Sequence, residues 1–187
     1  MRKLKLQMQM TVDGFVAGPQ GEMGWMVFDW DDSLKSYVAG IMQSVDCIVM
    51  GRKLAQGFIP HWAARPESEP DEAIDFMNNT PRVVFSRTLA ECPWANTTLP
   101  KGDMAAEIRR LKAQPGGDII TYGGAGFAAS LVKHNLVDEY HLFINPIAIG
   151  SGLRIFGELD GNLALRADEP RLFPNGIVVM RYRNALD

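Results

Sequence analysis

Alternating and periodic apolar positions divide the first part of the chain into a strand, a loop and a helix. Apolar and polar residues alternate over 4–10, which is the pattern of a strand with one buried and one exposed face. Four glycines and a proline over 11–24 predict a loop. A helix over 31–45, with Asp31 or Asp32 as its N-cap, is predicted by the helical spacing of Leu34, Val38, Ile41, Met42 and Val45.

The rest of the chain alternates between predicted strands and helices. Strands are expected at 46–51, 81–86, 118–122 and 137–149, and helices from 52 onward and at 71–79, 104–114 and 124–135. Residues 59–70 are expected to form a loop, and 162–173 should pair with 176–184 as an antiparallel hairpin around Pro174-Asn175-Gly176. These patterns predict an α/β fold with a mixed sheet, formed by one domain over 1–187.

Composition narrows the class of protein. The 187 residues are 47% apolar and 22% charged with a net charge of −3, so nothing indicates a nucleic-acid partner. No apolar run is long enough to cross a membrane, and no signal peptide is evident. The two cysteines form neither a disulfide framework nor a metal motif, and the three histidines are scattered. We therefore expect a cytoplasmic protein with a small-molecule ligand and no metal site.

Glycine stands at two junctions between a strand and a helix, "VMGRKL" (49–54) and "ITYGGAGF" (120–127). A helix N-terminus offers free N–H groups and a partial positive charge, and glycine lets a phosphate approach the backbone. The same glycines could instead serve tight turns and close helix packing, and their spacing does not decide between the two. "GGAG" is neither a dinucleotide-binding G-x-G-x-x-G nor a P-loop.

Charged side chains at other strand ends could complete such a site. Arg52 ends one predicted strand, and Ser86 and Arg87 end another. Two guanidinium groups facing one site would suit an additional phosphate, such as the 2′-phosphate of NADP, although each could also be a solvated surface arginine. Asp13, directly after the first strand, could take part in proton transfer or simply form an Asp-Gly turn. Trp25 could lie against a flat ring or pack in the core.

Four segments in this order resemble the dihydrofolate reductase-like superfamily. They are "TVDGFVAGPQGEMGW", "IVMGRKLAQGF", "PRVVFSRTL" and "IITYGGAGFAASLVKHNLVDEYHLFINPIAIGSGLRIF". The chain is most similar to the bacterial group related to the reductase domain of riboflavin-biosynthesis deaminase-reductases. The resemblance implies a three-layer α/β/α fold whose mixed, mostly parallel sheet ends in an antiparallel hairpin. It also implies NADPH as cofactor and a homodimer.

The resemblance also implies roles for individual residues. The loop that flanks the nicotinamide in the family corresponds here to Val16, Ala17, Gly18 and Trp25. Cofactor phosphates are expected at Gly51, Arg52, Lys53, Ser86, Arg87, Gly123, Gly124, Ala125 and Gly126. On the substrate side, Asp13 is the candidate catalytic residue, and substrate contacts are expected from Thr11, Asp13, Tyr122 and Ser151.

Two positions depart from the family pattern. Leu54 stands where many relatives have a threonine that caps the helix and meets phosphate, and Thr121 stands where riboflavin-pathway reductases have an acidic residue that helps hold the pyrimidine. The expected function is NADPH-dependent reduction of a polar heterocycle or a sugar-like imine or carbonyl, resembling 5-amino-6-(5-phosphoribosylamino)uracil reductase. The alternatives are a dihydrofolate reductase-type activity and an NADP-binding module without turnover.

Overall fold

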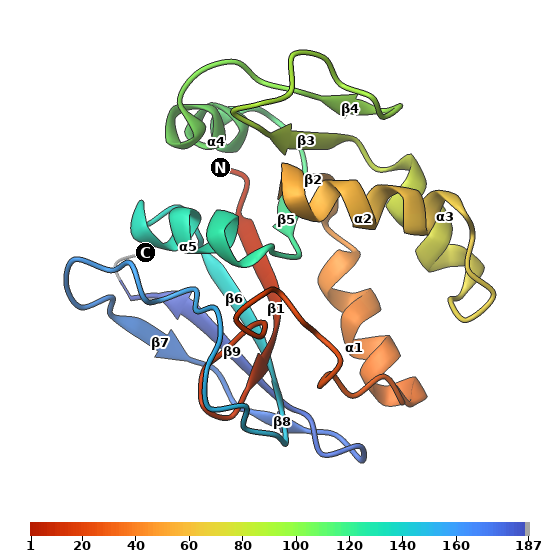
Figure 1. Ribbon diagram of the computed structural model, residues 1–187, viewed down its shortest axis with the longest axis vertical. Helices are drawn as coiled ribbons and strands as arrows, with labels where there is room; N and C mark the ends of the chain where they lie inside the picture. Colours follow the sequence, from red (N-terminus) through yellow and green to blue (C-terminus); the bar gives the residue numbers. More distant parts are fainter. Residues whose placement is uncertain (186–187) are drawn as a thin grey trace.

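The strands of the computed structural model, which describes residues 1–185, form one mixed sheet in the order β4-β3-β2-β5-β1-β6-β9-β7, with β8 paired to β9 (Figure 1). The first six strands of that order run parallel, and β9 is antiparallel to β6, β7 and β8. Their bounds are β1 (Leu4–Thr11), β2 (Val45–Gly51), β3 (Arg82–Phe85), β4 (Thr97–Thr98), β5 (Asp118–Thr121), β6 (Glu139–Asn145), β7 (Leu165–Ala167), β8 (Arg171–Leu172) and β9 (Val178–Asn184).

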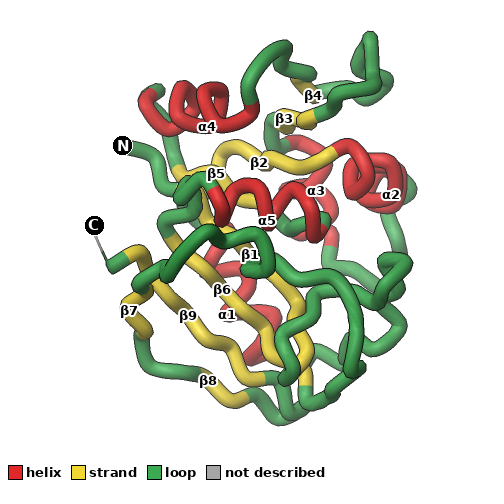
Figure 2. The backbone as a smooth tube through the Cα atoms, turned by 60° about the vertical axis from the view of Figure 1, so that its left-hand side comes forward, coloured by secondary structure: helices red, strands yellow, loops and turns green. Residues whose placement is uncertain are grey.

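Helices cover both faces of the sheet, which gives the expected three-layer arrangement. They are α1 (Asp32–Met42), α2 (Arg52–Ala63), α3 (Asp71–Asn79), α4 (Met104–Ala113) and α5 (Ala125–Lys133). One apolar cluster joins α1, α2 and α3 to the sheet, and a second joins α4 and α5 to its other face. Figure 2 shows α5 in front of the strands and α1 behind them. None of the helices in the described part of the chain is long and apolar enough to span a membrane.

Strand β1 lies in the middle of the sheet and is buried on both faces. The expectation of one exposed face was wrong, because β5 and β6 flank β1 and helices cover it from both sides. Its apolar residues face α4 and α5, whereas Lys5 and Gln7, each 8% exposed, face α1. Lys5 donates hydrogen bonds to the Ile41 carbonyl (3.0 Å) and to the Ser44 hydroxyl (2.8 Å) at the end of α1. Polar side chains therefore line a buried face of the central strand.

Two predicted boundaries were also wrong. Helix α2 continues through Pro60 to Ala63, where a loop was expected, because Ile59 is buried and Phe58 packs on Trp62. Proline costs one backbone hydrogen bond, and these apolar contacts offset it. Strand β6 ends at Asn145 rather than at 149, since the next residue is a proline.

The C-terminal hairpin is confirmed, with its first arm divided between β7 and β8. Residues Leu172 and Val178 pair next to the predicted turn, and Leu165 pairs with Asn184 at the far end. Because β1, β2, β3, β5 and β6 are parallel, their carboxyl ends share one edge of the sheet, and the loops that follow them come together there.

Candidate functional site

The two glycine junctions meet at the carboxyl edge of the sheet. A Cβ atom on Gly51 would lie 2.9 Å from the Cβ of Phe127, and one on Gly124 would lie 3.8 Å from the Cβ of Leu54. Both contacts join the start of α2 to the start of α5. Since a Cβ–Cβ distance of 2.9 Å is too short for two carbon atoms, position 51 requires glycine for this close approach.

The first turns of α2 and α5 leave their N–H groups without a side-chain acceptor among the described residues. By contrast, Asp31 caps α1 and Asp103 caps α4, and the first turn of α3 carries Asp71 and Glu72. Neither α2 nor α5 has an acidic residue in its first turn. Two adjacent helix N-termini with free N–H groups and no nearby carboxylate of their own are suited to an anion.

Gly123 shapes the turn that leads into α5. Its φ of +110° lies in the region that favours glycine, and a Cβ there would be 3.0 Å from the Cε of Met8. The Oγ1 of Thr121 accepts a long hydrogen bond (3.5 Å) from the Gly123 N–H, and Thr121 is completely buried. Thr121 therefore supports the turn and is not exposed to a ligand at the surface.

The two candidate arginines follow neighbouring strands. Gly51 pairs with Phe85 in the β2–β3 register, so Arg52 and Ser86 come next to each other at the same edge. Arg52 donates a hydrogen bond to the Gln56 Oε1 (3.0 Å) and Arg87 is exposed. The Ser86 Oγ accepts hydrogen bonds from the N–H groups of residues 88 (3.1 Å) and 89 (2.9 Å), which orders the loop that carries Arg87. Lys53 is also exposed.

The loop expected to flank a nicotinamide is fixed to the segment that follows β6. Val16 donates a hydrogen bond to the Leu153 carbonyl, and the Leu153 N–H donates to the Ala17 carbonyl, each at 2.9 Å. A Cβ on Gly152 would lie 2.1 Å from that Ala17 oxygen, so only glycine permits the pairing. Val16 and Ala17 are buried, as is Gly18, whereas Trp25 is half-buried and donates to the Glu22 carbonyl (3.2 Å).

Asp13 connects the end of β1 to the same segment. Its Oδ1 accepts a hydrogen bond from the Thr11 hydroxyl (2.5 Å), and its Oδ2 accepts from the N–H groups of Ile149 (3.1 Å) and Gly150 (2.7 Å). The Thr11 hydroxyl and these N–H groups lower the pKa of Asp13 below its ordinary value. A proton donor needs the opposite shift, and these hydrogen bonds instead connect the end of β1 to residues 149 and 150.

The remaining candidate substrate residues differ in their surroundings. Ser151 is exposed on the segment that Asp13 holds. The ring of Tyr122 stacks on Phe58 of α2, with ring centres 5.4 Å apart and an interplanar angle of 21°. The Tyr122 hydroxyl is buried and has no hydrogen-bond partner among the described residues. Burial raises the pKa of Tyr122, so this group keeps its proton at physiological pH.

Asn145 is a site residue that the sequence analysis did not identify. It is completely buried at the end of β6, and its Oδ1 accepts a hydrogen bond from the Val27 N–H (2.9 Å). Its Nδ2 donates to the Gln9 Oε1 (2.8 Å) and to the Phe143 carbonyl (3.1 Å). Asn145 therefore ties the loop before α1 to the sheet. The only sequence signal was a polar residue before Pro146, which is common in turns.

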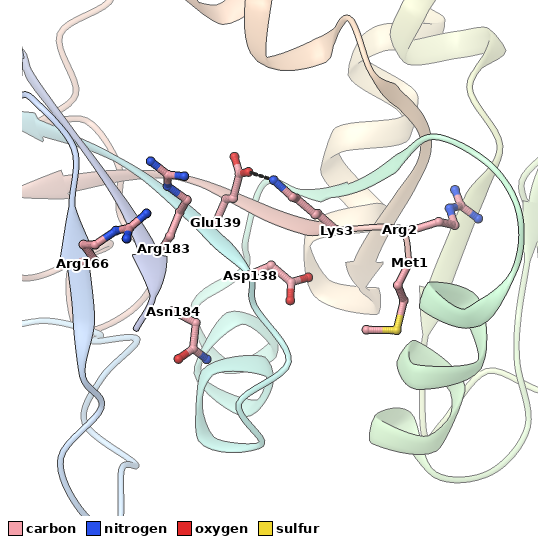
Figure 3. Close-up of a pocket in the computed structure, with 8 residues that line it drawn as sticks. All are labelled: Met1, Arg2, Lys3, Asp138, Glu139, Arg166, Arg183 and Asn184. Atoms are coloured by element: carbon pink, nitrogen blue, oxygen red, sulfur yellow. Dashed lines mark hydrogen bonds and ion pairs between the residues drawn. The ribbon is translucent and has the colours of Figure 1, made fainter. Parts of the chain in front are cut away.

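Two cavities lie away from this edge, near the amino ends of β1 and β6. The larger, of about 870 Å³, is lined by α1, Lys5, Glu139 and His141, and the smaller, of about 290 Å³, includes Lys3 and Glu139 (Figure 3). Glu139 is 3% exposed and accepts from Lys3 (2.8 Å) and Arg181 (2.9 Å). The His141 ring, whose Nε2 lies 3.5 Å from the Glu139 Oε2, together with these cations holds the pKa of Glu139 well below its usual range. Burial lowers the pKa of His141 despite Glu139, so the imidazole is neutral at physiological pH.

Comparison with known proteins agrees with the fold and places the chain in a family. The RibD C-terminal domain family matches residues 2–179. The uncharacterized protein YyaP of Bacillus subtilis is 30% identical over 184 residues, which cover 97% of this chain and 94% of YyaP. A putative riboflavin biosynthesis protein from Shewanella sp. PV-4 has a similar structure, with a TM-score of 0.72, 22% identity and coverage of 97% of this chain and 98% of that one.

A dihydrofolate reductase from Enterococcus faecalis, solved with NADP(H), shares the fold at 15% identity. Its TM-score is 0.65, and the match covers 98% of this chain and 96% of the reductase. The dihydrofolate reductase-like architecture expected from the sequence is thus confirmed, and the match over 2–179 shows that this chain belongs to the RibD C-terminal domain family.

Proposed function

We propose that the protein is an NADPH-dependent reductase that transfers hydride to a polar heterocycle or to a sugar-like imine or carbonyl. The family is one of riboflavin-pathway reductases, and 5-amino-6-(5-phosphoribosylamino)uracil is the reference for the kind of substrate we expect. The similar dihydrofolate reductase of Enterococcus faecalis was solved with NADP(H), which supports a nicotinamide cofactor here. A cytoplasmic homodimer is part of the same proposal.

The observation that carries this proposal is the contact between the first turns of α2 and α5. The contact of Gly51 with Phe127 places two uncapped helix N-termini side by side. Arg52 and Arg87 follow the neighbouring strands β2 and β3. Paired helix N-termini suit the pyrophosphate of a dinucleotide, and an arginine suits its 2′-phosphate. The residues present therefore match the chemical groups of NADP(H).

Bound at this edge, the reduced nicotinamide would supply the hydride. The chain's own residues would position the reactants and exclude water. Asp13 holds the segment of Ser151 against β1, and the pairing of Ala17 with Leu153 fixes the loop opposite it. Because Asp13 is ionised and already accepts hydrogen bonds from Thr11 and from residues 149 and 150, we propose that a water molecule delivers the proton.

Titration of the protein with NADP⁺ and NAD⁺, followed by tryptophan fluorescence, tests the proposal. Arg52→Ala and Arg87→Ala should each weaken NADP⁺ binding by about tenfold or more, since each removes a charge-assisted contact. Arg109→Ala is the matched control, because Arg109 is an exposed arginine on α4, a helix that contributes no residue to either glycine turn. It should leave the affinity unchanged.

The outcomes separate the alternatives. Oxidation of NADPH by a panel of aminopyrimidines, pteridines and sugar imines would support the reductase, and oxidation by dihydrofolate alone would favour the dihydrofolate reductase alternative. Tight NADPH binding without oxidation across the panel would favour a binding module. If NADP⁺ does not bind, or if Arg52→Ala and Arg87→Ala behave like Arg109→Ala, the proposed cofactor site is wrong.

A further inference from the structure

Three neutral side chains on one face of the sheet each have a buried polar atom without a hydrogen-bond partner among the described residues. These atoms are the Oε1 of Gln7 on β1, the hydroxyl of Tyr122, directly after β5, and the Nε2 of His141 on β6. Gln7 is 8% exposed, and the Tyr122 hydroxyl is buried although Tyr122 as a whole is half-buried. Leaving a buried polar group unpaired costs free energy, so a ligand that pairs with the Gln7 Oε1 and the Tyr122 hydroxyl would recover that cost.

The two groups lie in one row. The β1–β5 register pairs Lys5 with Ile120 and Leu6 with Thr121, so Gln7 and Tyr122 come next on adjacent strands. Lys5 and Ile120 both face α1, and the alternation of side chains brings Gln7 and Tyr122 to the same face. Parallel neighbours of this kind are about 4.8 Å apart along the row. The register therefore makes Gln7 and Tyr122 neighbours on this face.

Within residues 1–185, this face has no buried carboxylate that is free of a cationic partner. Glu139 is the only buried carboxylate among residues 1–185, and it accepts hydrogen bonds from Lys3 and Arg181. Asp31 is engaged as the N-cap of α1. Thr121, at the position where riboflavin-pathway reductases have an acidic residue, supports the glycine turn instead. A ring bound here would meet an amide oxygen and a phenolic O–H.

We propose that Gln7 and Tyr122 determine the substrate specificity of the reductase by forming hydrogen bonds with an N–H group and the adjacent carbonyl group of a neutral planar ring. The Gln7 Oε1 accepts a hydrogen bond from a ring N–H, and the Tyr122 O–H donates to the adjacent ring carbonyl. This inference rests on the proposed function, because Tyr122 immediately precedes the Gly123 turn at which the cofactor is expected. It excludes protonated or diamino-substituted rings as preferred ligands, since these need a carboxylate.

The test compares two fluorescent pteridines of the same skeleton, pteridine-2,4-dione and 2,4-diaminopteridine, near neutral pH with and without saturating NADP⁺. The dione should bind more tightly than the diamine. Tyr122→Phe and Gln7→Leu should each weaken binding of the dione by roughly fivefold to tenfold. Both variants should melt at the same temperature as the parent protein or higher, because each removes an unpaired buried polar group.

Tyr140→Phe is the matched control. The Tyr140 hydroxyl is also buried without a partner, but Tyr140 packs in the cluster with α5 on the opposite face of the sheet. Its removal should leave pteridine binding unchanged. The inference is overturned if Tyr122→Phe and Tyr140→Phe have equal effects, if the diamine binds as tightly as the dione, or if neither pteridine binds. The series without NADP⁺ reports on pteridine binding alone, and the titration with NADP⁺ tests the proposed function separately.

Discussion

Replacement of Gly51 by alanine tests the contact on which the cofactor site depends. The new methyl carbon would lie 2.9 Å from the Phe127 Cβ, whereas carbon atoms in contact prefer about 3.5–4.0 Å. Neither atom can rotate away, because the backbone fixes the position of every Cβ. The start of α5 must therefore move away from β2 by roughly 0.6–1 Å.

The expected cost follows from this displacement. Overpacking of a well-packed contact costs typically about 1–3 kcal/mol, and Phe127 also stacks on Phe85 with ring centres 5.3 Å apart. The φ of Gly51 is −79°, which any residue adopts, so the backbone adds no strain of its own. Urea denaturation should give a free energy of unfolding lower by about 1–3 kcal/mol with an unchanged m value. Affinity for NADP⁺ should fall as well.

Gly57→Ala is a control that should change the free energy of unfolding in the opposite direction. Gly57 lies inside α2, and a Cβ there would meet nothing within 4 Å. Alanine should therefore stabilise the protein by about 0.5–1 kcal/mol through its higher helix propensity. If Gly51→Ala is as stable as Gly57→Ala and binds NADP⁺ normally, then α2 and α5 do not approach each other as described.

Two further predictions concern buried and engaged charges. The pKa of His141 is lowered in the folded protein. As the pH falls, the histidine is therefore protonated in the unfolded chain before it is protonated in the folded protein. Below pH about 6.5 the free energy of unfolding should then fall by up to about 1.4 kcal/mol per pH unit. His141→Gln should remove that slope in denaturation series between pH about 7 and 5, and an unchanged slope would refute the assignment. Asp13→Asn should speed amide hydrogen exchange at Ile149 and Gly150, which lose their carboxylate acceptor, whereas Asp103→Asn at the cap of α4 should not.

Local patterns predicted the positions of helices and strands well where one physical factor dominated. The helix at 71–79 matches α3 at both ends, because acidic residues open it and its apolar residues keep helical spacing. Helix α2 was predicted too short, since Pro60 is a strong local signal that packing of Ile59 and Trp62 overrides. Tertiary contacts of this kind cannot be seen in a short window of sequence.

Some residues of the candidate site could likewise be identified from local sequence, whereas others depend on the fold. Gly51 and Gly123 could be recognised as special from sequence, and each is required by a close approach or a positive φ. The burial of Gln7 and Asn145 could not be recognised in this way. The alternation of "LQMQM" predicts an exposed polar face, and only the position of β1 in the middle of a covered sheet turns that face inward. The pKa of Asp13 is lowered mainly by the nearby Thr11 hydroxyl, but also by the N–H groups of residues 149 and 150, which are distant in the chain.

The central place of β1 has a consequence for synthesis on the ribosome. Its neighbours in the sheet are β5 and β6, which begin at Asp118 and Glu139. The strand that is translated first therefore has no partner until most of the chain has been made. Until then its apolar residues, Leu4, Leu6, Met8 and Met10, stay unprotected, and nascent chains that stop before β5 should engage chaperones or aggregate. The central strand of the sheet is thus translated first, whereas the two strands that flank it are translated late.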